Sequence, residues 1–129
     1  MILRKAMSLL GIGSAKIDLI LEKERFHPGE DVHGYFLLKG GTIEQQLKRI
    51  DCDLVMVDKK TGIEEILDSA TILTSKLIEA DEENKLPFTF KIPDTIQGSN
   101  PNVSYRFNTK LTFNQGVESL DEDVIHITS

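Results

Sequence analysis

Apolar and polar residues alternate along most of this chain, and the alternation predicts β-strands. The first run covers residues 16–23, where Ile17, Leu19 and Leu21 alternate with polar positions that include Asp18 and Glu22. A second run, residues 31–39, is rich in Val, Tyr, Phe and Leu. Pro28 and Gly29 lie between the two runs. Proline suits the second position of a tight turn, and glycine accepts the positive φ that a type II turn needs at the third. The pattern therefore predicts a β-hairpin.

Later segments repeat this alternation and are separated by turn-forming residues. They cover residues 47–58, 86–93, 105–113 and 124–127. About seven or eight strands in a chain of this length are typical of an antiparallel immunoglobulin-like β-sandwich. The sequence predicts that the following residues fill its core: Ile17, Leu19, Leu21, Val32, Tyr35, Leu37, Ile50, Cys52, Leu54, Phe88, Phe90, Tyr105, Phe107 and Leu111.

Residues 63–80 give two conflicting signals. Their apolar side chains match helical spacing, at Ile63, Ile66, Leu67, Ala70, Leu73 and Leu77. The β-branched stretch around Ile72 and the surrounding run of hairpins favour strands instead. We predict strand for this segment.

The first fifteen residues form a separate unit, so the chain divides into 1–15, an N-terminal helix and linker, and 16–129, the β-sandwich. Leu3, Met7 and Leu10 follow amphipathic helical spacing, and the glycines at 11 and 13 end the helix. The preferred interpretation is that this face covers an edge or end of the sandwich. The alternative is contact with a partner or a membrane, because a cationic apolar helix can lie on an anionic surface.

Charge and cysteine content exclude some classes of protein. The 129 residues carry a net charge of −6, which argues against a general nucleic-acid binder. Cys52 is the single cysteine, so no intrachain disulfide can form, as is typical of a cytoplasmic protein. We interpret it as a small buried apolar residue.

The sequence contains no recognisable catalytic motif. No serine or cysteine lies in a nucleophile motif, and the glycines at 11 and 13 lack the third glycine of a dinucleotide fingerprint. His27 and His33 flank the Pro-Gly turn, but two imidazoles do not complete a zinc site. We therefore expect no enzymatic activity, no cofactor and no metal.

Four stretches together identify a family. They are GIGSAKID at 11–18, PGEDVHG at 28–34, KGGTIEQ at 39–45 and LPFTFKIP at 86–93. With them, the whole chain resembles the bacterial sporulation-control protein family, SpoOM, whose first half has an arrestin-like sandwich. Members usually continue into a second β-rich part, whereas this chain stops after its last expected strand. It is either a short family member or the first domain of a longer protein.

The resemblance implies a non-enzymatic cytoplasmic interaction module that regulates or scaffolds sporulation and developmental control. The alternative is an arrestin-like trafficking or membrane-surface adaptor anchored by the N-terminal helix. We expect a protein partner, a weak homodimer through sheet edges and no nucleic acid; membrane contact is the lesser alternative. Eukaryotic arrestin-like proteins contain a buried charged cluster, which Asp18, Asp51, Asp53 and Arg106 could imitate. A solvated strand face explains these charges at lower cost.

Overall fold

The only helices or strands in the part of the chain that the structure describes are β-strands, which turns and loops connect. The computed structural model describes residues 14–114, 116 and 118–129. Its strands are β1 (Lys16–Leu21), β2 (Arg25–Phe26), β3 (Asp31–Lys39), β4 (Gln45–Asp58), β5 (Glu64–Leu73), β6 (Leu77–Ile78), β7 (Glu83–Lys91), β8 (Val103–Phe113) and β9 (Glu118–Ile127). Within these residues there is no helix with the length and apolar composition that crossing a membrane requires.

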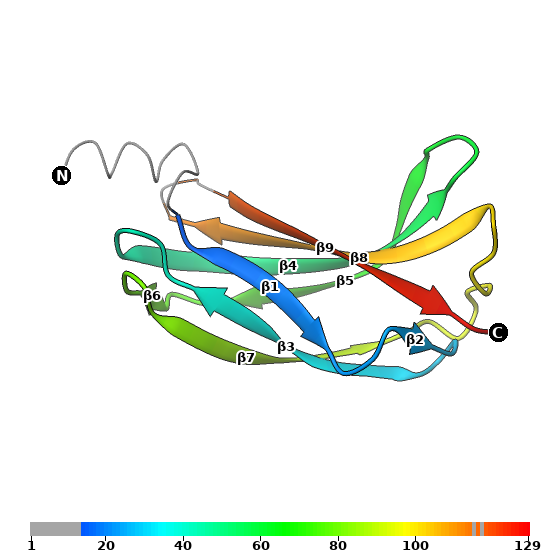
Figure 1. The fold of residues 1–129 in the computed structure, drawn as a ribbon, viewed down its shortest axis with the longest axis horizontal. Helices are drawn as coiled ribbons and strands as arrows, with labels where there is room; N and C mark the ends of the chain where they lie inside the picture. The colour runs from blue at the N-terminus through cyan, green and yellow to red at the C-terminus, as the bar shows by residue number, and fades with distance from the viewer. Residues whose placement is uncertain (1–13, 115, 117) are drawn as a thin grey trace.

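The strands form two packed sheets (Figure 1). One has three strands in the order β1-β3-β7, and the other has six, in the order β2-β9-β8-β4-β5 with β6 also paired to β4. Neighbouring strands are antiparallel except for the short β2–β9 pair. The predicted antiparallel β-sandwich is confirmed. The predicted N-terminal helix falls on residues 1–13, which lie outside the described residues.

The predicted hairpin is confirmed, with one addition. β1 and β3 pair antiparallel from Lys16 opposite Lys39 to Leu21 opposite Gly34. At the turn, the Glu30 N–H donates to the His27 carbonyl at 3.1 Å, and Gly29 has φ of 81°, as a type II turn requires. Between β1 and this turn, β2 leaves the first sheet and pairs with β9 of the second. The chain therefore links the two sheets early in its course.

The ambiguous segment is strand, as predicted. β5 pairs with β4 over nearly its whole length, and β6 pairs with the start of β4. A bulge between Leu54 and Val55 breaks the β4–β5 register. Bulges bend and twist a strand pair, and the tip of this hairpin turns away from the sheet in Figure 1. The apolar residues that imitated helical spacing are mostly exposed on β5 and beside it.

The core lies between the sheets and is centred on four phenylalanines. The rings of Phe88 and Phe90 each contact Phe107 edge-on, at centroid distances of 5.6 and 5.2 Å. Phe36 contacts Phe88 in the same manner at 5.1 Å. Edge-to-face pairs add to the stabilisation that burial of the rings provides. Eleven of the fourteen predicted core residues are buried.

Three predicted core residues, Leu21, Tyr35 and Leu37, are only half-buried. On β3 the buried apolar side chains are Val32, Phe36 and Leu38 instead. Side chains of a strand alternate strictly between its faces, so the inward positions on β3 are the even-numbered ones. The prediction of Tyr35 and Leu37 was wrong because apolar residues occupy both faces of the second half of this strand.

Candidate functional site

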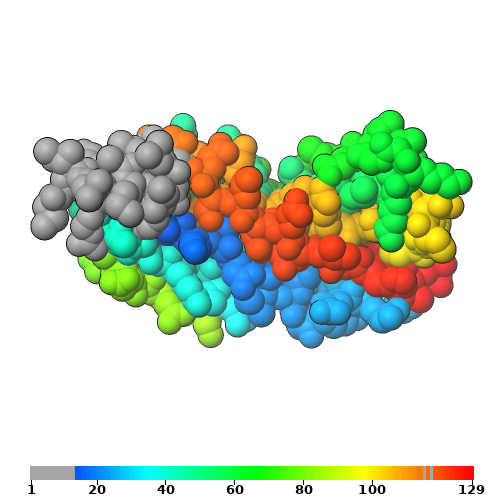
Figure 2. All heavy atoms as spheres, turned by 45° about the horizontal axis from the view of Figure 1, so that its top comes forward, coloured from blue at the N-terminus to red at the C-terminus, as the bar shows by residue number. Residues whose placement is uncertain are grey.

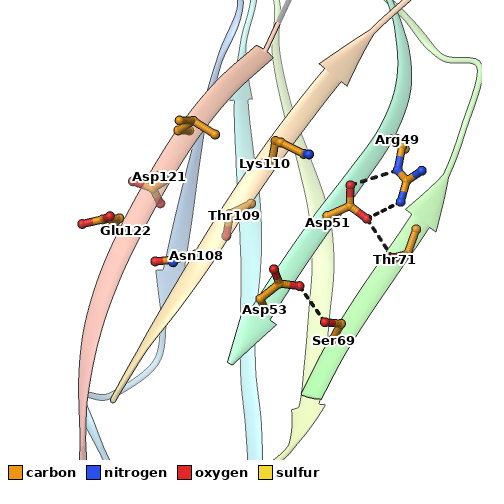
Figure 3. Close-up of a pocket in the computed structure, with 11 residues that line it drawn as sticks. Arg49, Asp51, Asp53, Ser69, Thr71, Asn108, Thr109, Lys110, Asp121 and Glu122 are labelled. Carbon is orange, nitrogen blue, oxygen red and sulfur yellow. Dashed lines mark hydrogen bonds and ion pairs between the residues drawn. The ribbon is translucent and has the colours of Figure 1, made fainter. Parts of the chain in front are cut away.

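The six-stranded sheet carries a polar groove on the face that points away from the core. Its lining residues come from β5, β4, β8 and β9, and it encloses about 490 Å³. In Figure 2 the surface dips between the green atoms of the β4–β5 hairpin and the orange atoms of β8 and β9. The groove is therefore a concave part of an exposed sheet face, and Figure 3 shows its side chains.

The strand registers place polar side chains side by side across this groove. Antiparallel partners on one face have neighbouring Cβ atoms, so each register row is a row of potential contacts. One row contains Thr71, Asp51, Lys110 and Leu120, and the next contains Ser69, Asp53, Asn108 and Glu122. Residues far apart in the sequence thus form one continuous surface, which is polar except at Leu120.

Asp51 is the most strongly held side chain in the groove. Its carboxylate accepts two hydrogen bonds from the Arg49 guanidinium, at 2.8 and 2.9 Å, and one from the Thr71 hydroxyl at 2.9 Å. The bonds from Arg49 are the main reason that the pKa of Asp51 lies below its usual value. Asp51 is therefore an ionised, fully paired carboxylate and is poorly suited to act as a general base at neutral pH.

In the neighbouring row, the negative charges of Asp53 and Glu122 are less well neutralised. Asp53 accepts one hydrogen bond, from the Ser69 hydroxyl at 2.6 Å, and forms no ion pair with a described residue. Glu122 lies 4.0 Å from Arg106, which forms a closer ion pair with Glu64. This part of the groove therefore has an excess of negative charge and suits a cationic or hydrogen-bond-donating group of a ligand.

A second cluster of charges lies where β1 meets β9, between the two sheets. The carboxylates of Asp18, Asp121 and Asp123 offer ligand atoms within 4.8 Å of one another. Asp121 also accepts a hydrogen bond from the Leu19 N–H at 2.9 Å, which joins the edges of the two sheets. Oxygen ligands suit Ca²⁺ or Mg²⁺, but Ca²⁺ takes about six to eight of them. A cation here would need water or further groups to complete its coordination.

The same cluster raises the pKa of two of its carboxyl groups above that of an ordinary aspartate. Desolvation, followed by the hydrogen bond and charge of Asp121, raises the pKa of Asp123 to about 7. Desolvation and the charge of Asp121 also raise the pKa of Asp18. The folded protein therefore binds protons at these carboxylates more tightly than the unfolded chain, where an aspartate titrates near about 3.9.

This cluster predicts a pH-dependent stability. A raised folded-state pKa gives stability that is fully present below the unfolded-state pKa and is lost as the pH rises through the folded-state pKa. The free energy of unfolding should fall between about pH 4 and pH 7, by about 1 kcal/mol from Asp123 after allowance for solvent screening. Asp123→Asn should remove most of this fall in urea titrations at pH 5 and pH 8. An equal fall in the variant would contradict the assignment.

The residues singled out from sequence do not converge on one site. Leu3, Met7 and Leu10 lie outside the described residues. His27 is hydrogen-bonded through Nδ1 to the Thr128 carbonyl at 2.8 Å, and His33 lies on β3 opposite Thr89 of β7, within the three-stranded sheet.

The four charges considered for an arrestin-like cluster are also divided. Asp51 and Asp53 line the groove, Arg106 lies on the same sheet and pairs with Glu64, and Asp18 belongs to the carboxylate cluster. The solvated strand face that sequence reasoning preferred describes the first three better than a buried cluster.

Cys52 is a buried residue, as its position in the pattern predicted. Its thiol accepts a hydrogen bond from the Thr109 hydroxyl at 3.6 Å. Desolvation raises the pKa of Cys52 to about 12, so the reactive thiolate is scarcely populated at neutral pH. This chemistry does not suit a nucleophile.

Neither the polar groove nor the cluster of Asp18, Asp121 and Asp123 was predicted from the sequence. Asp121 and Asp123 come just before the predicted closing strand, residues 124–127, whereas the strand β9 begins at Glu118 and includes both aspartates. The alternation of Leu120, Glu122 and Val124 with these aspartates was the available signal. It is easily overlooked because apolar residues occupy the exposed face of this strand.

The comparisons with known proteins agree on one family. A family model described as SpoOM protein matches residues 3–129. The sporulation-control protein spo0M of Bacillus subtilis strain 168 is 33% identical to the chain over 130 residues, which cover 96% of this chain and 50% of that protein. A crystal structure of Spo0M from Bacillus subtilis has a TM-score of 0.82 and 32% identity, over 92% of this chain and 51% of that one.

A more distant structure shows how widely the architecture occurs. A Niemann-Pick type C2 protein from the Japanese carpenter ant has a TM-score of 0.56 at 12% identity, over 89% of this chain and 93% of that one. This likeness concerns the fold alone. The chain spans about half the length of the curated relative that it matches.

Proposed function

Because this chain belongs to the SpoOM protein family, we propose that it is a non-enzymatic cytoplasmic protein-interaction module that acts as a regulator or scaffold in sporulation control. The name of its Bacillus subtilis relative, a sporulation-control protein, supports the regulatory role. The chemistry of the described residues supports binding over turnover. Asp51 is neutralised by Arg49, and the Cys52 thiol is buried with a raised pKa.

The observation that carries the proposal is the free edge of β5. This strand pairs with β4 on one side and with no described strand on the other. Ile66 and Leu73 on it are 61% and 76% exposed, and Ile63 just before it is 66% exposed. An unpaired strand edge with exposed apolar side chains is a template for pairing with another chain. A partner that added a strand here would satisfy both the backbone groups and the apolar residues.

The opposite sheet shows how an edge is protected against such pairing. β7 is an edge strand of the three-stranded sheet, and it carries Pro87 together with Lys85 and Lys91. Proline and lysine are common protections of strand edges. β5 contains neither residue type. The contrast favours β5 as the interaction edge.

The charges on and beside β5 favour a basic partner segment. Glu64, Glu65 and Asp68 are exposed on the strand, and the polar groove with Asp53 adjoins it through Ser69 and Thr71. Complementary charge accelerates association and is screened by salt. We therefore expect a partner with an extended basic segment, and association that weakens as salt is added. Two copies of β5 can also pair with each other, so a weak homodimer is part of the proposal.

The test replaces the two exposed apolar residues of β5. Ile66→Lys together with Leu73→Lys should weaken self-association and partner binding by at least about tenfold, because lysine at a strand edge opposes pairing and its ammonium must be desolvated. Light scattering over a concentration series reports the homodimer. Affinity capture from sporulating cells, read by mass spectrometry, reports the foreign partner.

Val124→Lys is the control for a single lysine placed away from β5, since Val124 is 72% exposed on β9 of the same sheet. It should leave both associations unchanged. A partner or dimer that the β5 variant retains would contradict the use of this edge. Catalytic turnover that follows the purified protein and is lost on a point mutation would contradict the non-enzymatic function itself.

A further inference from the structure

A second concavity lies at the end of the sandwich that carries the C-terminus. There β2, the end of β9 and the loop before β8 meet (Figure 1). The concavity encloses about 550 Å³, and its lining includes Arg25, Lys59, Ser104 and His126. The polar groove of the previous subsections is lined by an entirely different set of residues. This second pocket has had no role in the function proposed above.

Strand pairing holds three of these side chains in a row. Arg25 on β2 is the register partner of His126 on β9, and both are exposed while the following pair, Phe26 and Ile127, is buried. Arg25 and His126 therefore project to the same side of the sheet. The β8–β9 register pairs Tyr105 with Ile125. Its continuation by one residue places Ser104 beside His126 on that side.

The loop between Ser99 and Val103 forms a fixed wall of the pocket. The Asn100 side-chain oxygen accepts hydrogen bonds from the Asn102 and Val103 N–H groups, at 2.7 and 2.9 Å. The Lys59 N–H donates to the Asn102 carbonyl at 2.8 Å, so the backbone beneath the Lys59 side chain is tied to this loop. Because the oxygen of Asn100 is engaged within the loop, its amide NH₂ is the part that can donate to a ligand.

The charge of this pocket is opposite to that of the protein. The whole chain carries −6, yet the pocket lining contains an arginine, a lysine and a histidine against one carboxylate, Glu24. Of the three described arginines, Arg49 and Arg106 form ion pairs with carboxylates, whereas Arg25 forms none with a described residue. Lys59 likewise has no ion pair within the described part of the chain. These cations are free to meet an external anion.

We propose that this pocket binds a phosphoryl group, as a free phosphate or a phosphate monoester. A guanidinium matches two phosphate oxygens in a bidentate manner, and an ammonium adds a point charge. The Ser104 hydroxyl, the Asn100 amide and a ring N–H of His126 supply neutral donors around the same space. Donors on several sides suit a tetrahedral oxyanion better than a planar carboxylate. Glu24 opposes the ligand and limits its affinity.

The experiment is a titration of the isotope-labelled full chain, followed by amide chemical shifts at constant ionic strength. The probes are inorganic phosphate and O-phosphoserine, with acetate as the control anion. Saturable shifts should occur at Arg25, Lys59, Ser104 and His126 with both phosphate probes and not with acetate. Saturable binding of inorganic phosphate but not of O-phosphoserine would identify free phosphate as the ligand. Tighter binding of O-phosphoserine would favour a phosphate monoester.

Variants make the assignment falsifiable. Arg25→Gln with Lys59→Gln should weaken phosphate binding at least tenfold, whereas Glu24→Gln should strengthen it. Lys85→Gln with Lys91→Gln removes the same charge from the opposite sheet and should change nothing. All five substituted residues are exposed, so the variants leave the buried faces of both sheets unchanged, and a melting curve verifies the fold. Shifts that acetate reproduces, or that the Arg25 and Lys59 variant retains, would overturn the proposal.

Discussion

Phe107→Ala is expected to lower the free energy of unfolding by about 3–5 kcal/mol, the usual cost of removing a fully buried phenylalanine. Phe107 is completely buried on β8 and contacts Phe88 and Phe90 of the opposite sheet edge-on. Its removal opens a cavity between the two sheets and ends both ring contacts. Urea unfolding at equilibrium, followed by circular dichroism, measures the loss.

Leu73→Ala provides the reference for this experiment. Leu73 is also apolar and lies on the same sheet, but it is exposed at the β5 edge. Its truncation should change the free energy of unfolding by less than about 0.5 kcal/mol. Similar losses for the two variants would mean that the aromatic cluster is not the centre of the core.

The second large effect is expected at Gly34, the only position of β3 without a side chain. A Cβ there would lie 2.2 Å from the Ile20 carbonyl oxygen and 3.2 Å from the Leu21 Cα. Both atoms belong to the backbone of β1, which cannot move aside as a side chain can. Gly34→Ala should therefore push β1 away from β3 and cost about 3 kcal/mol, the upper end of the range for overpacking.

Gly62→Ala separates the steric effect from the general cost of replacing a glycine. Gly62 has φ of 73°, and nothing lies within 4 Å of the Cβ that alanine would add. Its replacement costs only backbone strain, about 1 kcal/mol. Thermal unfolding of both variants should show the larger loss at Gly34. A smaller loss at Gly34 would contradict the close approach of β1.

The sequence predicted the fold well where one face of a strand is apolar and the other polar. This pattern occurs on β7 and β8, and both strands were predicted correctly. The turn at Pro28 and Gly29 was also predicted correctly, from its residue types. Prediction failed on the second half of β3, where Tyr35 and Leu37 compete with Phe36 and Leu38 for the inward face. Only the packing of the opposite sheet decides such a case, and that information is not local.

The charged sites depend on strand pairing and were less predictable. Asp18 and Asp123 are separated by most of the chain, and they meet because β1 lies beside the part of β9 that is not paired with β2. The pairing of Arg25 with His126 likewise depends on the crossing of β2 to the second sheet, which no sequence signal indicated. The β5 edge was obscured by its helical spacing of apolar residues.

The proposed interaction through β5 can be tested directly in sporulating cells. A photo-crosslinking amino acid would replace Glu65, an exposed residue on β5, or in a second strain Lys85, an exposed residue on β7. These positions lie on edge strands of the two different sheets. The proposal predicts a discrete crosslinked protein adduct from position 65 that is absent from position 85. No adduct at position 65, or the same adduct at both positions, would contradict it.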